Sequence, residues 1–158
     1  MDTIEGVQSA RGFRFAIVVS RYHDFVTGRL EQAARAALES AGADDVAVVR
    51  VPGAFELPSA ARLTAATGDF HAVVCLGCLV RGATPHFDVI AAAVAQGLVA
   101  VSVETGVPVT FGVLTTNSLE EALERAGDGP TNKGWEAAIA AVEMAEVAAR
   151  LARRVSAS

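Results

Sequence analysis

The chain has 158 residues and a net charge of −5 at pH 7, a length that predicts one domain and an acidic balance that argues against nucleic acid as a partner. Hydrophobic residues make up 52% of it, yet no apolar run reaches the roughly 18 residues of a membrane span, and the first residues lack the pattern of a signal peptide. We therefore expect a cytoplasmic protein that buries its excess apolar surface in contacts between subunits.

The first half of the chain predicts strands that alternate with helices. Short apolar runs rich in β-branched residues indicate strands at 14–20, 46–51 and 72–79. Apolar residues recur at helical spacing over 24–41 and 56–67, and a glycine follows each of these segments as a C-terminal cap. This alternation is typical of a parallel sheet with helices on both faces.

The middle of the chain predicts one more helix and two more strands. A helix is expected at 87–97, and Gly97 is taken as its end. Strands are expected at 99–103, a run rich in valine, and at 109–114. The apolar run over 91–103 is therefore interpreted as the end of this helix followed by a strand. Neither element is long enough to span a membrane.

The last part of the chain predicts a short helix and a long one. Ser118 and the glutamates that follow it form a capping box, and this helix stops near Gly127. Asn132 caps a helix from residue 133 to about residue 155, which is apolar on more than one face. We expect a single domain over 1–158, in which residues 1–12 form an N-terminal arm or an edge strand.

The turn over 77–88 is the strongest candidate for a ligand site. It follows a buried strand and precedes a helix, and ligands of open α/β sheets bind outside the carboxyl ends of the strands. Gly77 and Gly82 have the spacing of a nucleotide-binding loop, but the lysine that such a loop needs is absent. The turn therefore offers backbone amides and a helix start to an anion.

Other turns converge on the same edge of the predicted sheet. Tyr22 and Phe55 supply aromatic faces on which a planar heterocycle can stack, and Glu56 supplies a carboxylate. His86 is the candidate for proton transfer, because imidazole titrates near neutral pH. The alternative is a histidine at a helix start that only contacts Asp88.

Several other polar residues have simpler structural interpretations. Cys75 and Cys78 form a Cys-x-x-Cys pattern, but without a second cysteine pair they are interpreted as small buried residues. His71 is interpreted as structural. Arg81 either binds phosphate or contacts a carboxylate of another subunit, and the second interpretation is preferred.

Six stretches carry a pattern that spans nearly the whole chain in a fixed order: residues 15–22, 51–58, 76–87, 106–116, 124–127 and 132–136. With this pattern the chain resembles the 6,7-dimethyl-8-ribityllumazine synthase family of riboflavin biosynthesis. The resemblance implies a flavodoxin-like three-layer αβα sandwich with a central parallel sheet. It also implies a homo-oligomer built of pentamers, with active sites between adjacent subunits.

The same resemblance implies a reaction that needs neither a cofactor nor a metal. In this family, 5-amino-6-(D-ribitylamino)uracil condenses with 3,4-dihydroxy-2-butanone 4-phosphate to 6,7-dimethyl-8-ribityllumazine, with release of phosphate and water. The implied partners are thus two small-molecule substrates. Within one subunit, Tyr22 would stack on the pyrimidine ring, Ala54 and Glu56 would hold the ribityl chain, and Leu79 and Val80 would meet the ring edge.

The resemblance also implies how the phosphate substrate is held. Gly82, Ala83 and Thr84 would cradle the phosphate, and His86 would transfer protons. From the neighbouring subunit, Phe111 would close the pocket, Arg125 would bind the phosphate and Lys133 would contact the pyrimidine.

The chain departs from the family pattern at two places. Tyr22 stands where Phe or Trp is common, and His23 stands where Asn is frequent. The turn over 127–131 lacks a lysine that many members have, so the choice between pentamer, decamer and sixty-subunit shell stays open. Alternative functions are a flavin-binding paralogue with little synthase activity and a shell-forming scaffold. His86 together with Arg125 favours catalysis.

Overall fold

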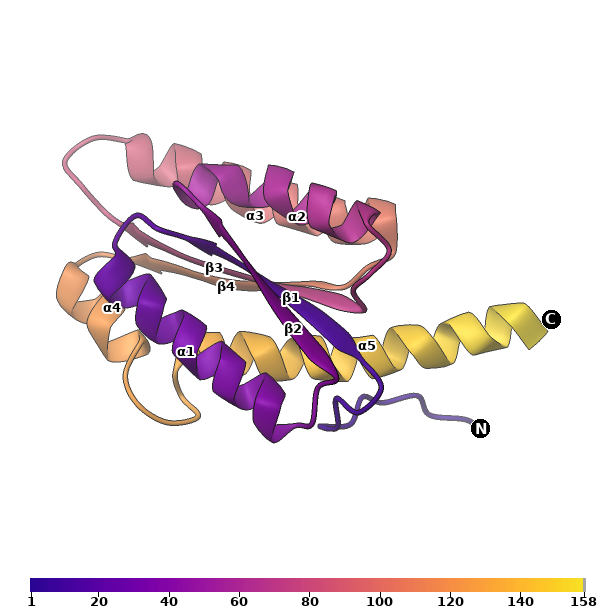
Figure 1. Ribbon diagram of the computed structural model, residues 1–158. Helices are drawn as coiled ribbons and strands as arrows, with labels where there is room; N and C mark the ends of the chain where they lie inside the picture. Colours follow the sequence, from indigo (N-terminus) through magenta and orange to yellow (C-terminus); the bar gives the residue numbers. More distant parts are fainter. Residues whose placement is uncertain (158) are drawn as a thin grey trace.

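The computed structural model describes residues 1–157 and is built around a four-stranded parallel sheet (Figure 1). The strands are β1 (Arg14–Ser20), β2 (Asp45–Val51), β3 (Ala72–Val80) and β4 (Val109–Thr116), and their spatial order is β2-β1-β3-β4. β1 pairs in parallel with β2 and with β3, and β3 pairs in parallel with β4. The predicted α/β class with a central parallel sheet is confirmed.

Helices cover both faces of the sheet and make three layers (Figure 1). One face carries the 3-10 turn η1 (Ala54–Glu56) and helices α2 (Leu57–Ala66) and α3 (His86–Thr105). The other face carries helices α1 (Asp24–Ser40), α4 (Leu119–Arg125) and α5 (Lys133–Ala157). All the strand-to-helix turns lie at one end of the sheet, at the carboxyl ends of the strands, because the strands are parallel.

Two hydrophobic cores lie on the two sides of the sheet. Alternate side chains of a strand point to opposite faces, so Ile17 of β1 packs toward α1 and α5 whereas Val18 packs toward α2 and α3. Both side chains are fully buried. The near-continuous apolar sequences of β1 and β3 follow from this burial on both sides.

Local signals in the sequence end and begin the helices as expected. Gly42 and Gly68 adopt φ angles of +89° and +75° after α1 and α2, a left-handed conformation that favours glycine. Oδ1 of Asn132 accepts hydrogen bonds from the backbone amides of Gly134 (2.7 Å) and Trp135 (3.3 Å), which caps α5. The predicted bounds of these helices are therefore close to the observed ones.

In the middle of the chain the strand expected at 109–114 is confirmed as β4, but the prediction for residues 87–103 was wrong. Residues 87–97 and 99–103 are not a helix and a strand but parts of one helix, α3, which runs for 20 residues. Gly97 lies inside α3 against Pro58 of α2, where a Cβ atom would come within 2.8 Å of the proline ring. This glycine permits close packing of two helices rather than ending one. The sheet has four strands in residues 1–157 as a result.

Helix α3 is also long and apolar enough to cross a membrane, by length and composition alone. The apolar run within this helix, residues 91–103, is nevertheless interrupted by Gln96 and Ser102, as the sequence shows. Only 17% of its apolar stretch is buried within the chain. Val94 and Leu98 pack into the core, whereas Val99 and Val103 are 63% and 77% exposed. An apolar stripe along α3 is thus left uncovered by the rest of the chain.

The N-terminal arm forms no strand in the structure, so the edge-strand alternative for residues 1–12 is not observed. The arm lies along α5 of its own chain. Nε2 of Gln8 donates to Oε1 of Glu143 at 3.4 Å, and Arg154 pairs with Asp2 near the carboxyl end of the helix. Figure 1 shows that this last part of α5 extends past the edge of the sheet.

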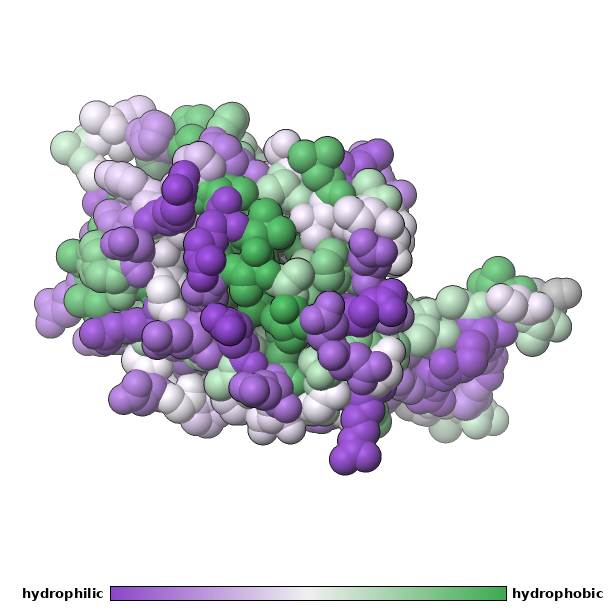
Figure 2. Space-filling view, in the orientation of Figure 1, coloured by the Kyte–Doolittle hydropathy of each residue, from purple (hydrophilic) through white to green (hydrophobic). Residues whose placement is uncertain are grey.

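Strand β2 forms an open edge of the sheet. Its residues Val46 and Val48 are only half-buried, because no strand pairs with this edge in residues 1–157. Figure 2 shows an apolar strip in the middle of this face, where β2 crosses the same view in Figure 1. An open apolar edge is a surface that proteins normally cover.

Candidate active site

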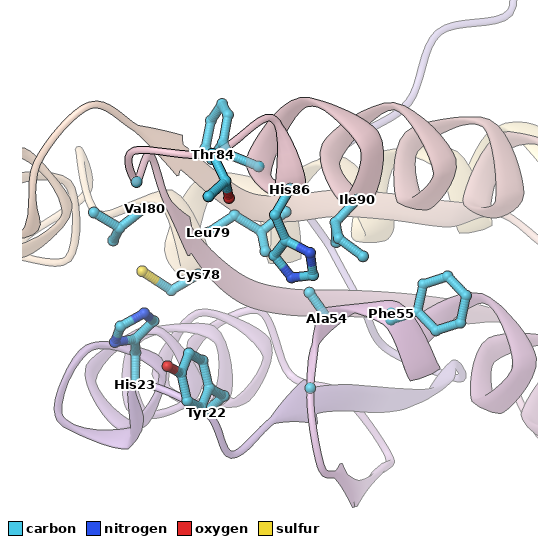
Figure 3. A pocket seen from close by; sticks show the side chains of 13 residues that line it. Tyr22, His23, Ala54, Phe55, Cys78, Leu79, Val80, Thr84, His86 and Ile90 are labelled. Atoms are coloured by element: carbon cyan, nitrogen blue, oxygen red, sulfur yellow. The ribbon is translucent and has the colours of Figure 1, made fainter.

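A cavity of about 520 Å³ opens at the carboxyl ends of the strands, between the turns that follow β1, β2 and β3 (Figure 3). Eight residues that were predicted from the sequence line it: Tyr22, Ala54, Phe55, Leu79, Val80, Gly82, Thr84 and His86. The topological rule for open parallel sheets therefore gave the correct position of the cavity.

His86 is the first residue of α3, and its imidazole points into the cavity toward Ala54 (Figure 3). The alternative contact with Asp88 is not observed, and the Asp88 carboxylate instead lies 3.3 Å from Nη1 of Arg81. Within residues 1–157 the His86 imidazole has no hydrogen-bond partner. It is therefore available to a ligand as a donor or acceptor.

Tyr22 is held by backbone hydrogen bonds that continue the pairing of β1 with β2. The amide of Arg21 donates to the carbonyl of Val51 at 2.8 Å, and the amide of Tyr22 donates to the carbonyl of Pro52 at 3.1 Å. These bonds hold Tyr22 beside the turn that carries Ala54. The ring is 68% exposed, so it can stack on a planar ligand.

Arg81 fixes the turn that precedes α3. Its Nε donates to Oδ1 of Asn117 at 3.0 Å, its guanidinium lies 4.5 Å from the centre of the Phe87 ring, and it pairs with Asp88. Arg81 thus has a carboxylate partner within its own chain, and the expected contact with another subunit stays a prediction. These contacts tie the turn with Gly82 to both β4 and α3.

Five predicted residues do not line the cavity of a single chain: Glu56, Ala83, Phe111, Arg125 and Lys133. Glu56 turns its carboxylate to the start of its own helical turn, where Oε1 accepts from the Gly53 amide at 2.9 Å. Nζ of Lys133 lies 3.5 Å from Glu136, and Phe111 is 40% exposed on β4. No lysine or arginine of the described chain lines the cavity.

The cavity also includes five residues that were not predicted as site residues: His23, Gly53, Cys78, Phe87 and Ile90. Phe87 and Ile90 follow His86 on α3, and Ile90 is one helical turn beyond it, so helical spacing could have identified Ile90. Gly53 and His23 each adjoin a predicted residue. Cys78 lies at the end of β3, where the strand meets the cavity.

The two cysteines are free and buried, as expected. Burial raises the pKa of Cys75 to about 12 and that of Cys78 to about 11, because the thiolate loses its hydration in an apolar environment. Both thiols are thus protonated at neutral pH and are poor nucleophiles. Among residues 1–157, no three His, Cys, Asp or Glu side chains are grouped to hold a metal.

His71 is structural, as predicted. Its Nδ1 accepts a hydrogen bond from the Arg14 amide at 2.9 Å, and its ring meets the edge of Phe13 with the ring centres 5.0 Å apart. These contacts join the start of β1 to the segment before β3. The imidazole lies at the end of the sheet away from the cavity.

The cavity lies outside the carboxyl ends of a parallel sheet, which is where open α/β proteins bind small molecules. The family model described as 6,7-dimethyl-8-ribityllumazine synthase matches residues 12–149. The chain therefore belongs to the 6,7-dimethyl-8-ribityllumazine synthase family.

Individual relatives agree over almost their whole length. The 6,7-dimethyl-8-ribityllumazine synthase of Syntrophus aciditrophicus is 50% identical over 150 residues, which cover 93% of this chain and 97% of the relative. The enzyme of the same name from Chlorobaculum parvum is 50% identical over 91% of this chain and 94% of its own. That of Chlorobaculum tepidum is 49% identical over 93% and 96%.

Proposed function

We propose that this protein condenses 5-amino-6-(D-ribitylamino)uracil with 3,4-dihydroxy-2-butanone 4-phosphate to 6,7-dimethyl-8-ribityllumazine, with release of phosphate and water. It is a transferase of riboflavin biosynthesis. The observation that carries the proposal is that one cavity is lined by a stacking ring, an imidazole and a glycine turn. These are Tyr22, His86 and the turn residues Gly82 and Thr84.

The proposed chemistry suits the residues of the cavity. The amine of the pyrimidine substrate attacks the ketone, so the protein does not need a nucleophile of its own. It has to position two substrates, bind the phosphate that leaves and move protons. Tyr22 supplies a stacking surface for the pyrimidine, and His86 supplies an imidazole for proton transfer.

The phosphate requires positive charge that one chain does not bring to the cavity. No arginine or lysine of residues 1–157 lines it. We therefore propose that Arg125 and Lys133 of an adjacent copy complete the site, and that Phe111 of that copy closes it. The open edge at β2 and the uncovered stripe of α3 support a homo-oligomer. A pentamer-based assembly in the cytoplasm is the state we propose.

The test is a direct assay with purified protein. The two substrates are mixed and the absorbance of the lumazine product is followed beside a reaction without protein. The His86→Ala variant should lower kcat by about 100-fold, the range of general acid–base catalysis, while wild-type protein clearly exceeds the uncatalysed rate. The oligomeric state of the variant is measured by light scattering as a control.

Two results would contradict the proposal. Wild-type rates in His86→Ala would remove the role of that residue. No acceleration by the wild-type protein, together with tight binding of riboflavin, would instead indicate a flavin-binding protein.

A further inference from the structure

His23 has an unusual backbone conformation at the mouth of the cavity. Its φ and ψ angles are 61° and 49°, and it is the one non-glycine residue with positive φ in residues 1–157. Its carbonyl accepts hydrogen bonds from the amides of Val26 (2.9 Å) and Thr27 (3.0 Å), which begins α1. A left-handed residue other than glycine is strained, and such residues gather at functional sites.

The imidazole of His23 has no part in starting the helix. It makes no capping hydrogen bond to α1, and its contacts within the described chain are two aromatic rings. The Tyr22 ring centre lies 4.4 Å away with the planes tilted by 56°, and the Phe25 ring centre lies 5.9 Å away at 89°. The ring nitrogens therefore keep their hydrogen-bonding capacity for another group.

The left-handed turn brings this imidazole to the cavity. Figure 3 shows the rings of His23 and Tyr22 side by side on one wall, with His86 on the far side and Cys78 and Val80 nearby. His23 is half-buried, and the strand residues that face it are apolar or a protonated thiol. Water or a bound ligand is thus the natural partner for its nitrogens.

We propose that His23 is a specificity-determining residue for the pyrimidine substrate: its ring supports Tyr22 from the side, and one of its nitrogens hydrogen-bonds the ring edge or a hydroxyl of the bound ribitylaminopyrimidine. This inference rests on the proposed function. The position on the Tyr22 wall assigns His23 to the substrate that stacks there. The phosphate substrate belongs to the turn with Gly82 on the opposite wall.

The test compares two variants that both accept a left-handed backbone. His23→Gly removes the imidazole, and His23→Asn keeps a hydrogen-bonding group, since asparagine tolerates this conformation well. Arg29→Ala, an exposed change on the same helix, is the control. KM is measured separately for each substrate. Binding of a ribitylaminouracil that lacks the reactive 5-amino group is measured by calorimetry, so that affinity is read without turnover.

We expect His23→Gly to raise KM for the pyrimidine, and the dissociation constant of the unreactive analogue, by about fivefold to tenfold, the effect of one hydrogen bond. KM for the butanone phosphate and the melting temperature should change little. His23→Asn should stay within about threefold of wild type, because its amide replaces the imidazole as a partner.

The inference is overturned if His23→Gly binds the analogue as tightly as wild type. It is also overturned if both KM values rise equally while the melting temperature falls, since that pattern shows a purely structural residue. If wild-type protein forms no lumazine but binds the analogue in a His23-dependent way, the proposed function fails and the binding role of His23 stands. If wild-type protein does not bind the analogue, both fail.

Discussion

Ser20, the last residue of β1, carries the one buried side-chain polar atom in residues 1–157 that has no hydrogen-bond partner. Its residue is 1% exposed, and its Oγ lies in the packed region around Leu57 and Gly77. A buried hydroxyl without a partner is destabilising, because it has lost water and gained nothing in return. We expect Ser20→Ala to raise the free energy of unfolding by about 1 kcal/mol, measured by urea denaturation.

Thr116→Val is the matched control for this change. Thr116 is 3% exposed, and its Oγ1 donates to the carbonyl of Ser118 at 2.8 Å. Removal of this satisfied hydroxyl should lower the free energy of unfolding by about 1 kcal/mol. A loss of stability in Ser20→Ala similar to that in Thr116→Val would show that the Ser20 hydroxyl is in fact hydrogen-bonded.

The sequence predicted which residues lie at the cavity where the order of strands and helices decides their position. It did not predict the orientation of individual side chains or the backbone angles of single residues. Tyr22 lies in the turn after β1, and His86 begins the helix after β3, so the sequence alone indicated that both lie at the carboxyl ends of the strands. The carboxylate of Glu56, in contrast, accepts a hydrogen bond from the Gly53 amide instead of lining the cavity, and residue types alone do not determine this orientation. The sign of φ at His23 likewise cannot be read from residue types.

At the scale of helices and strands, two glycines inside helices differ in how closely the neighbouring elements pack against them. A Cβ atom added at Gly28 in α1 would meet no atom within 4 Å, whereas one added at Gly97 in α3 would lie 2.8 Å from the ring of Pro58. We expect Gly28→Ala to raise the free energy of unfolding by about 0.5–1 kcal/mol through helix propensity. Gly97→Ala should lower it by about 1 kcal/mol, because overlap with a rigid ring outweighs that gain.

Both variants are compared by urea denaturation at one protein concentration, because the stability of an oligomer depends on concentration. Each variant serves as the control for the other, since the chemical change is identical. Equal stabilisation by the two substitutions would contradict the close packing of α2 on α3.

The same glycine explains where the prediction of elements failed. Gly42 and Gly68 sit at the ends of helices with positive φ, so reading them as stops was correct. Gly97 looks the same in the sequence, and the valines that follow it favour a strand. Only the position of Pro58 on the neighbouring helix reveals that Gly97 is a packing residue, and that contact is not local in the sequence.

At the scale of the whole molecule, a single chain offers half of a phosphate-binding site. Its cavity contains a stacking ring and an imidazole but no arginine or lysine from residues 1–157. The same chain leaves apolar surface open on α3, where Val89, Val99 and Val103 are each more than half exposed. Neighbouring copies of the chain would both cover this apolar surface and supply the cation that the cavity lacks.

A site shared between copies predicts that two inactive variants restore each other. His86→Ala removes the imidazole from the cavity, and Arg125→Ala removes the proposed cation from the adjacent copy. If the two variants are unfolded together in equal amounts and refolded, about a quarter of the sites pair an intact His86 with an intact Arg125 by random assembly around a ring. The mixture should therefore recover about a quarter of the wild-type activity at saturating substrates.

The controls are each variant refolded alone and the two variants mixed after separate refolding, all of which should stay near the low activity of the single variants. Light scattering on each sample verifies that assembly is equal. A mixture that stays as inactive as its components, although it assembles normally, would place His86 and Arg125 in the same chain's site. It would then require that chain to bring α4 to its own cavity, which the structure does not do.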